Sequence, residues 1–488
     1  MSAGTQPNIL WYCTDQQRYD TINALGNSYI STPNLNALIE DGVAFKNTYC
    51  QSPICTPSRA SFMTGRYPAS HHVHRNGNPY FPSSETLISS ILAKNGYDCG
   101  LIGKQHLSRA NIVEQRPEDD GYSFYQWSHH PYPDWPEGHA YADWVNAQGV
   151  DHEELYKKLR RDEGPPVELH QTKWCSDMAI DFIKQDREGP WMLNINVFDP
   201  HTPFDPPPEY MEKYDPEEMP YPLFQESDIE HQKKMINIDQ QTKVAIDPYA
   251  PVPKVEAATG DARFLAPRYF DARKIKAAYY AMIELIDDQF KRIVDTLKEL
   301  GEYENTIIIF TSDHGEMLGD HGLLQKGCRF FEGLSHVPLI MSWPGKSVKN
   351  LHSEALVEMI DIFPTLLDAA KIEIPENVQG KSLLPIMLGD AEAHHHKDLV
   401  LCEYNDALAG KGIDDHTHGL MVFDGRYKIC IYEGHEIGEL YDLQEDPGEF
   451  DNLWEKEEFA ALKGEMTLKA SQKFLNSSDA GLARVARY

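Results

Sequence analysis

Apolar runs of strand length alternate with helical patterns along most of the chain, and this alternation limits the fold more than any other feature. Residues Asn8–Thr14 (NILWYCT) predict a buried strand. Further strands are expected at 98–103, 191–198, 306–311 and 337–342, with helices between them at about 33–42, 87–96, 172–185 and 271–300. Such a pattern is typical of an α/β protein with a large, mainly parallel sheet flanked by helices.

The pattern changes twice in the second half of the chain. Seven prolines between residues 203 and 222 disfavour helix and central strand, so an irregular insertion is expected over about 202–267. After residue 390, short strand patterns at 399–403, 419–423 and 427–432 precede a helical pattern near 457–475. We therefore predict a large domain over 1–390 and a small antiparallel C-terminal α+β domain over 391–488.

The charge balance restricts the partners of the protein. The chain has 45 basic and 76 acidic residues, a net charge of −31. Such a surface repels nucleic acid and anionic lipid, so neither nucleic acid nor a membrane is expected as a partner. The sequence shows no membrane-length apolar run and no secretory signal, which predicts a cytoplasmic location. Small-molecule substrates fit this surface, and a homo-oligomer is compatible with it.

Four chemically versatile side chains each follow a predicted strand. Asp15, Lys104, His201 and Asp313 lie just beyond the runs that end near residues 14, 103, 198 and 311. In open parallel sheets, ligands bind at the carboxyl ends of the strands. We therefore expect these residues to converge although they are far apart in the chain.

One cysteine lies in an unusual setting. The eight cysteines are scattered without a Cys-x-x-Cys pair, which argues against a disulfide framework or a zinc knuckle. Cys55 begins the stretch CTPSRASFMTGRYP, in which Pro57 and Ser58 favour the start of a helix. The free amides of that helix start would favour an anion, and Arg59 would lie one turn further along. A buried free cysteine is the alternative interpretation for an isolated thiol.

This motif resembles the signature of the formylglycine-dependent type I sulfatases, which belong to the alkaline phosphatase superfamily. That signature is Cys-x-Pro-Ser-Arg followed by a Thr-Gly pair, here Thr64-Gly65. The resemblance implies that a formylglycine-generating or sulfatase-maturing enzyme oxidises Cys55 to formylglycine, whose hydrate is the nucleophile. It also implies an alkaline-phosphatase-like fold and hydrolysis of sulfate monoesters of the arylsulfatase type.

The resemblance further implies one divalent cation. Asp15-Gln16 and Asp313-His314 are similar to the metal-binding pairs of the family. Carboxylate, amide and imidazole ligands suit a hard or borderline cation, and a cation relieves the repulsion between two acids. Ca²⁺ is the first expectation, with Mn²⁺ and Mg²⁺ as alternatives.

The remaining catalytic candidates match other family motifs. Lys104 and His106 resemble the Gly-Lys-x-His stretch, and they share one face of an extended segment. His201 and Lys326 resemble the pocket histidine and the second pocket lysine. The resemblance implies that Arg59 and Lys104 stabilise sulfuryl oxygens. It implies that His201 and Lys326 assist the leaving oxygen, and that His106 acts as a base.

Two other functions remain open. Asn76 resembles a substrate-binding residue of phosphonate monoester hydrolases, although an Asn-Gly turn would explain it equally well. A phosphonate monoester hydrolase or phosphodiesterase on the same fold is therefore the alternative activity. Retention of Lys104 and His106 favours sulfate over that alternative. A catalytically silent binding protein would be expected to lose Cys55 or a metal ligand. The alcohol that is released stays undetermined.

Overall fold

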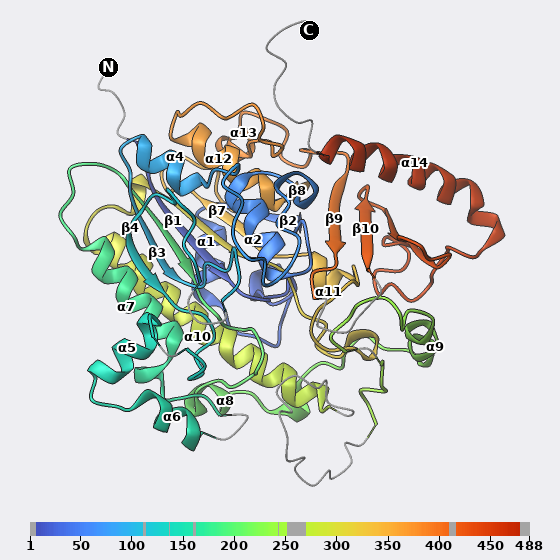
Figure 1. Cartoon of the computed structure of the whole chain (residues 1–488), viewed down its shortest axis with the longest axis horizontal. Helices are drawn as coiled ribbons and strands as arrows, with labels where there is room; N and C mark the ends of the chain where they lie inside the picture. Colours follow the sequence, from blue (N-terminus) through green and yellow to red (C-terminus); the bar gives the residue numbers. More distant parts are fainter. Residues whose placement is uncertain are drawn as a thin grey trace, which may run out of the picture.

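Eight strands form the main sheet, in the spatial order β4-β3-β5-β1-β6-β7-β2-β8 (Figure 1). The computed structural model describes residues 6–478 except 111–113, 136, 160–162, 243, 251–269 and 409–415. Among the described strands of this sheet, β7 alone runs antiparallel to its neighbours. The strand bounds are Asn8–Thr14 (β1), Val43–Tyr49 (β2), Asp98–Gly103 (β3), Tyr122–Trp127 (β4), Trp191–Asn196 (β5), Thr306–Ser312 (β6), Leu339–Ser342 (β7) and Leu351–Glu358 (β8).

Helices cover both faces of this sheet, as Figure 1 shows. Successive residues of β1 point to opposite faces, so Leu10 packs with the core beneath α7 and α10, whereas Trp11 packs beneath α2. One face carries α1 (Pro33–Glu40), α5 (Ala140–Ala147), α6 (His152–Lys158), α7 (Gln171–Ile183) and α10 (Ala272–Glu299). The other carries α2 (Cys55–Thr64), α4 (Ile88–Lys94), α12 (Ile362–Ala369) and α13 (Leu384–Leu388). None of the described helices has both the length and the apolar character needed to cross a bilayer.

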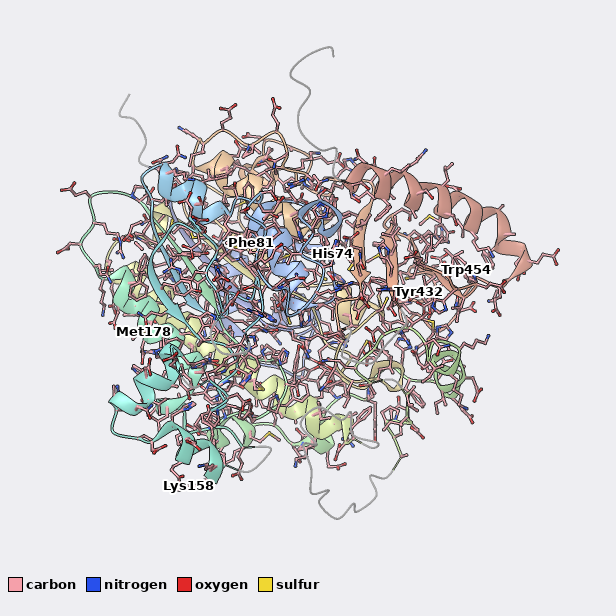
Figure 2. The ribbon with its side chains drawn as sticks, in the orientation of Figure 1. His74, Phe81, Lys158, Met178, Tyr432 and Trp454 are labelled. Atoms are coloured by element: carbon pink, nitrogen blue, oxygen red, sulfur yellow. The ribbon has the colours of Figure 1, made fainter. Side chains whose placement is uncertain are left out.

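A second sheet has four antiparallel strands in the order β12-β11-β10-β9. These strands span Val400–Asn405 (β9), His418–Phe423 (β10), Tyr427–Tyr432 (β11) and Gly438–Asp442 (β12). The helix α14 (Ala460–Ser477) packs on β10 and β11 and contributes Met466 and Ala470 to a separate apolar core. In Figure 2, Tyr432 and Trp454 lie in this part of the molecule, on the opposite side from Met178 and Lys158. The predicted fold class is confirmed, while the domain boundary at residue 390 stays a prediction.

The segment from residue 202 contains more helix than the prolines suggested. It holds α8 (Pro208–Met211) and α9 (Glu226–Lys234), and residues 243 and 251–267 of the predicted insertion lie outside the described residues. The helix α9 begins with a capping box in which Gln225 and Asp228 satisfy each other's backbone N–H groups. No proline occurs between residues 223 and 247, so this helix is compatible with the local sequence.

A buried charge cluster fastens α14 to the main sheet. Lys397 Nζ donates to Glu358 Oε2 and Asp361 Oδ1, both at 2.6 Å. Lys473 of α14 donates to the same Glu358 oxygen at 3.1 Å. Both carboxylates are fully buried, so their charges depend on these lysines.

Lys397→Met is expected to lower the free energy of unfolding at neutral pH by about 3–5 kcal/mol, because it leaves two buried carboxylates without their main cation. Urea unfolding followed by circular dichroism measures this change. Lys349→Met is the control, since it removes an exposed lysine paired with Asp41, and it should leave the unfolding midpoint unchanged. Equal midpoints for the two variants would contradict the prediction.

The effect of Lys397→Met should depend on pH. Burial alone would raise the pKa of Asp361. Lys397 and His396 lower it by more than burial raises it, so the net pKa lies below its ordinary value. A carboxylate whose pKa is lowered by folding stabilises the folded state. Its full contribution is present at pH values above the ordinary pKa of about 4, and it is lost as the pH falls toward the folded-state pKa. The difference between wild type and variant should therefore shrink below about pH 4.

Candidate active site

The carboxyl ends of four neighbouring strands bring the predicted polar residues together. Thr14 pairs with Ser312 at the ends of β1 and β6, so Asp15 and Asp313 leave the sheet side by side. Lys104 follows β3 and its backbone N–H donates to Asn196 at the end of β5 at 2.9 Å. His201 lies a few residues beyond that strand. The topology thus places four distant segments around one point.

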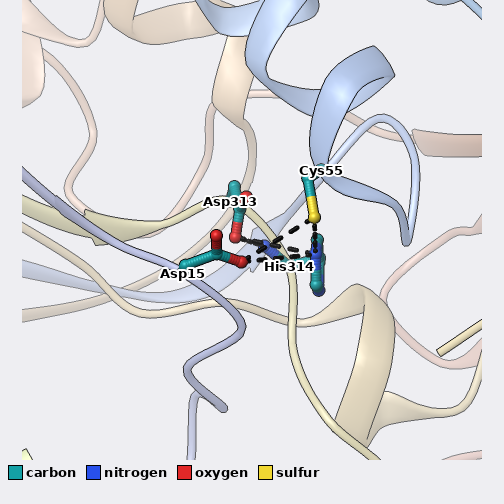
Figure 3. A group of neighbouring side chains, drawn as sticks. All are labelled: Asp15, Cys55, Asp313 and His314. Carbon is teal, nitrogen blue, oxygen red and sulfur yellow. Dashed lines mark hydrogen bonds and ion pairs between the residues drawn. The ribbon is translucent and has the colours of Figure 1, made fainter. Parts of the chain in front are cut away.

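Cys55 is the first residue of α2, and its side chain faces the two acids (Figure 3). The thiol is 1% exposed and lies 3.8 Å from Asp15 Oδ1 and 3.1 Å from His314 Nε2. Ser58 on the same helix donates to the backbone carbonyl of Asp313 at 2.6 Å, which fixes α2 against the end of β6. The predicted placement of Cys55 at a helix N-terminus is therefore observed.

Asp15, Cys55, Asp313 and His314 form a cluster that could hold a cation. One potential ligand atom from each lies within 4.8 Å of the others. His314 Nδ1 lies 2.9 Å from the carbonyl of Gly315, so it donates there and leaves the Nε2 lone pair facing the cluster. Two buried carboxylates and an imidazole whose Nε2 faces them suit a hard or borderline divalent cation.

Gln16 presents its side-chain oxygen to the same centre. Its Oε1 accepts from Lys326 Nζ at 2.7 Å, and its Nε2 donates to Glu316 Oε2. Glu316 is fully buried and also accepts from the backbone N–H of Leu318 at 3.2 Å. The carboxylate of Glu316 therefore fixes which end of the Gln16 amide faces the cluster. The sequence did not predict a role for Glu316, because its burial beside Gln16 cannot be inferred from the Asp313-His314 motif.

Three cationic side chains surround Cys55 and the acids. Arg59 Nε donates to Asp313 Oδ2 at 2.9 Å, and Lys104 forms an ion pair with Asp15. Lys326 Nζ lies 2.9 Å from the Cys55 sulfur. Burial alone would raise the pKa of Cys55. The nearby charges of Lys104, Lys326 and His314 lower it by more than burial raises it, so the net pKa lies well below its ordinary value. The site is therefore built to stabilise negative charge at this position.

Two histidines lie at the edge of this charged centre. His201 Nε2 is 3.0 Å from Lys326 Nζ, and its Nδ1 is 2.6 Å from the Thr202 carbonyl. The His106 ring is buried, and among the described residues its Nδ1 has no hydrogen-bond partner. Burial, followed by the charge of Lys104, lowers the pKa of His106 to about 4. His106 is thus neutral at pH 7 and able to accept a proton.

The His106 segment is held by a carboxylate that the sequence analysis also missed. The segment is not extended as the sequence predicted, because His106 has a left-handed backbone with φ 53°. Glu114 accepts the backbone N–H of His106 at 2.7 Å and that of Ser108 at 3.2 Å. Glu114 lies in no strand-end motif, so only the fold shows that it supports this turn.

Asn76 occupies a different position from the charged residues. Its Oδ1 accepts the backbone N–H of Thr56 at 3.0 Å, which caps the first turn of α2 next to Cys55. The side chain is half-buried. This hydrogen bond brings Asn76 close to Cys55, although the two residues are far apart in the sequence. The contact of Asn76 with substrate stays a prediction.

Comparisons with known proteins identify the relatives of this chain. The family model Sulfatase matches residues 7–372, and the model "N-sulphoglucosamine sulphohydrolase, C-terminal" matches residues 319–475. An arylsulfatase of Clostridium perfringens is 30% identical over 93% of this chain and 91% of that protein. A choline-sulfatase of Rhizobium meliloti is 28% identical over 93% of this chain and 83% of that protein. The crystal structure of a phosphonate monoester hydrolase of Agrobacterium radiobacter superposes with a TM-score of 0.81, at 25% identity over 99% of this chain and 98% of that one.

Proposed function

Since the chain belongs to the sulfatase family of sulfuric ester hydrolases, we propose that it hydrolyses sulfate monoesters with a formylglycine derived from Cys55 and one divalent cation. The observation that carries this proposal is the cluster of Asp15, Cys55, Asp313 and His314 at the N-terminus of α2. A buried nucleophile position, two acids and three flanking cations match the needs of a reaction in which an anionic ester is attacked.

Asp15, Gln16, Asp313 and His314 would hold the cation, with Ca²⁺ as the first expectation and Mn²⁺ or Mg²⁺ as alternatives. When bound, the cation would supply Lewis acidity toward a sulfuryl oxygen, and the formylglycine hydrate would supply the nucleophilic oxygen. The donor set supports this assignment because it contains carboxylate, amide and imidazole groups turned toward one point. A maturing enzyme that converts Cys55 belongs to the same proposal.

The side chains around Cys55 divide the remaining tasks. Arg59 and Lys104 offset the negative charge of the sulfuryl oxygens. Their ion pairs with Asp313 and Asp15 hold both cations beside the cluster, where these oxygens would bind. Lys326 and His201, whose nitrogens are 3.0 Å apart, protonate or stabilise the departing oxygen. His106 and Asp313 are the candidates for accepting protons. Asn76 completes the set as a substrate-binding residue next to the α2 N-terminus.

Phosphonate monoester or phosphate diester hydrolysis is the second candidate function. It is favoured by the similarity to the phosphonate monoester hydrolase structure over nearly the whole chain. The two activities would use the same nucleophile position and the same cation. The substrates are all monoanions, but a sulfate monoester presents three non-bridging oxygens, whereas a phosphonate monoester or phosphate diester presents two. Lys104 is the residue that separates them in our proposal, because its ammonium lies beside Asp15, where it can bind the additional oxygen.

We expect kcat/KM for an aryl sulfate to exceed that for the matched phosphonate monoester and phosphate diester by about tenfold or more, which corresponds to about 1.4 kcal/mol. All three substrates are measured on one cation-loaded batch whose aldehyde content has been confirmed by labelling. Lys104→Met should lower the value for the sulfate by about 10²–10³-fold. Lys94→Met, which removes a surface lysine paired with Asp119, should change none of the three. A preference for the phosphorus esters would establish the second candidate function instead.

A further inference from the structure

A cavity of about 530 Å³ lies outside the catalytic cluster, where several distant parts of the chain meet. Its walls come from the loop after Gln16, from the start of α10, from residues 220–223 and from the small domain around Glu449. None of the catalytic or cation-binding residues assigned above lines it. Its volume falls in the range of ordinary small-molecule sites, about 300–1,000 Å³.

Lys276 is the lining cation that forms no ion pair and no hydrogen bond among the described residues, although the charges of Asp20 and Asp320 act on it from further away. It lies in the second turn of α10 and is 7% exposed. In the described part of the chain, no carboxylate lies within ion-pair distance of its amine, and no acceptor forms a hydrogen bond with it. The other lining cations are paired, Arg18 with Asp320 at 2.8 Å and Lys46 with Glu354 at 2.6 Å. Burial lowers the pKa of Lys276, and the charges of Asp320 and Asp20 offset this effect only in part.

The acids that line the cavity are all engaged. Asp20 and Asp320 bind Arg18, and Asp320 also accepts the backbone N–H of Leu223 at 2.9 Å. Glu332 and Glu449 both form ion pairs with Lys428 behind the wall. The cavity therefore offers a free donor to an anion, whereas it offers no free carboxylate among the described residues to a cation.

Aromatic rings form much of the remaining wall. The Tyr19 ring stacks on His336 at 3.9 Å, and the Phe331 ring stacks on His321 at 3.8 Å. Tyr280 is 4% exposed and lies one turn after Lys276 on α10, so ring and amine share one face of the helix. Flat rigid walls of this kind favour a flat ligand body by stacking.

We propose that this cavity binds a small aromatic carboxylate, with its carboxylate group on Lys276 and its ring against the tyrosine and phenylalanine walls. The site is independent of the proposed sulfatase chemistry. Arg18 links it to the catalytic cluster, since its side chain donates to the Glu316 carbonyl at 2.8 Å. Binding at the cavity is thus measurable whether or not Cys55 has been converted.

Benzoate is the test ligand, and isothermal titration calorimetry on the full-length protein gives its dissociation constant. We expect benzoate to bind at least about tenfold more tightly than benzamide, which has the same ring without the charge, and benzylamine should not bind. Lys276→Met should weaken benzoate binding by at least about tenfold. Lys291→Met, an exposed lysine of the same helix that is paired with Asp295, is the matched control and should leave it unchanged.

One further variant and one further measurement make the test decisive. Lys326→Met reports on binding at the catalytic cluster, so a loss of benzoate binding in this variant, with Lys276→Met unaffected, would overturn the proposal. Absence of benzoate binding, or equal binding of benzylamine, would overturn it too. Lys276→Met should melt at the same or a higher temperature than wild type, because it removes a largely buried amine that has no hydrogen-bond acceptor among the described residues. A lower melting temperature would show that Lys276 has a structural partner, and this would also contradict the assignment.

Discussion

A Cys55→Ser variant is expected to release a single equivalent of alcohol from an aryl sulfate and then to stop. Serine places a hydroxyl at the start of α2, where Lys104, Lys326 and Arg59 stabilise negative charge. This hydroxyl can attack once, but a sulfated serine has no second hydroxyl on the same carbon that could expel the sulfate. The steady-state rate should therefore fall by at least about 10³-fold, or about 4 kcal/mol in the barrier.

Rapid-mixing kinetics would show this as a burst without a following linear phase. Mass spectrometry of the protein should then show one added sulfuryl group on the peptide that contains residue 55. Cys99→Ser is the matched control, because the Cys99 thiol already donates to the Ser89 carbonyl at 3.6 Å and a hydroxyl can do the same. Sustained multiple turnovers by Cys55→Ser would refute the proposed role of this position.

Asp313→Asn is expected to abolish cation binding and to lower kcat/KM by about 10³-fold or more. The substitution keeps the shape of the side chain but removes one of the two charges that would hold the cation. It also leaves the buried Arg59 without its 2.9 Å carboxylate partner. A loss of several kcal/mol of Lewis-acid stabilisation corresponds to an effect of this size.

The cation-dependent change in melting temperature tests this prediction without any assay of activity. Wild type should be stabilised by Ca²⁺, by about 2.7 kcal/mol at a hundredfold excess over the dissociation constant, whereas Asp313→Asn should show no shift. Asp287→Asn is the control, since Asp287 is equally buried but accepts from the backbone N–H of Leu35, far from the cluster. A Ca²⁺-dependent shift that survives in Asp313→Asn would exclude this residue as a ligand.

Much of the arrangement followed from local sequence patterns. The long apolar runs of β1, β5 and β6 are buried on both faces, so their hydrophobic pattern is unbroken and easily recognised. Residues that follow such strands must lie at one edge of the sheet, which is why Asp15 and Asp313 could be placed together. Cys55 could be placed at a helix start because Pro57 and Ser58 are common in first turns.

Other features depend on tertiary contacts that no local pattern shows. β4 (YSFYQW) is half-exposed at a sheet edge and lacks an apolar run, so only its pairing with β3 makes it a strand. Glu316 and Glu114 are ordinary acids in the sequence, and they gain their roles from burial beside Gln16 and His106. The isolation of Lys276 likewise depends on which acids its neighbours have already bound.

The burial of α2 sets an order of events for the proposed maturation. All ten residues of this helix are buried, and Cys55 is enclosed by side chains from the ends of β1 and β6. An enzyme that oxidises Cys55 would therefore have to reach it before these strands have come together. A chain that folds before oxidation would keep the Cys55 thiol. The fraction of protein molecules that carry formylglycine would therefore depend on the rate of oxidation relative to the rate of folding. Later incubation of the folded protein with the maturing enzyme would not recover it.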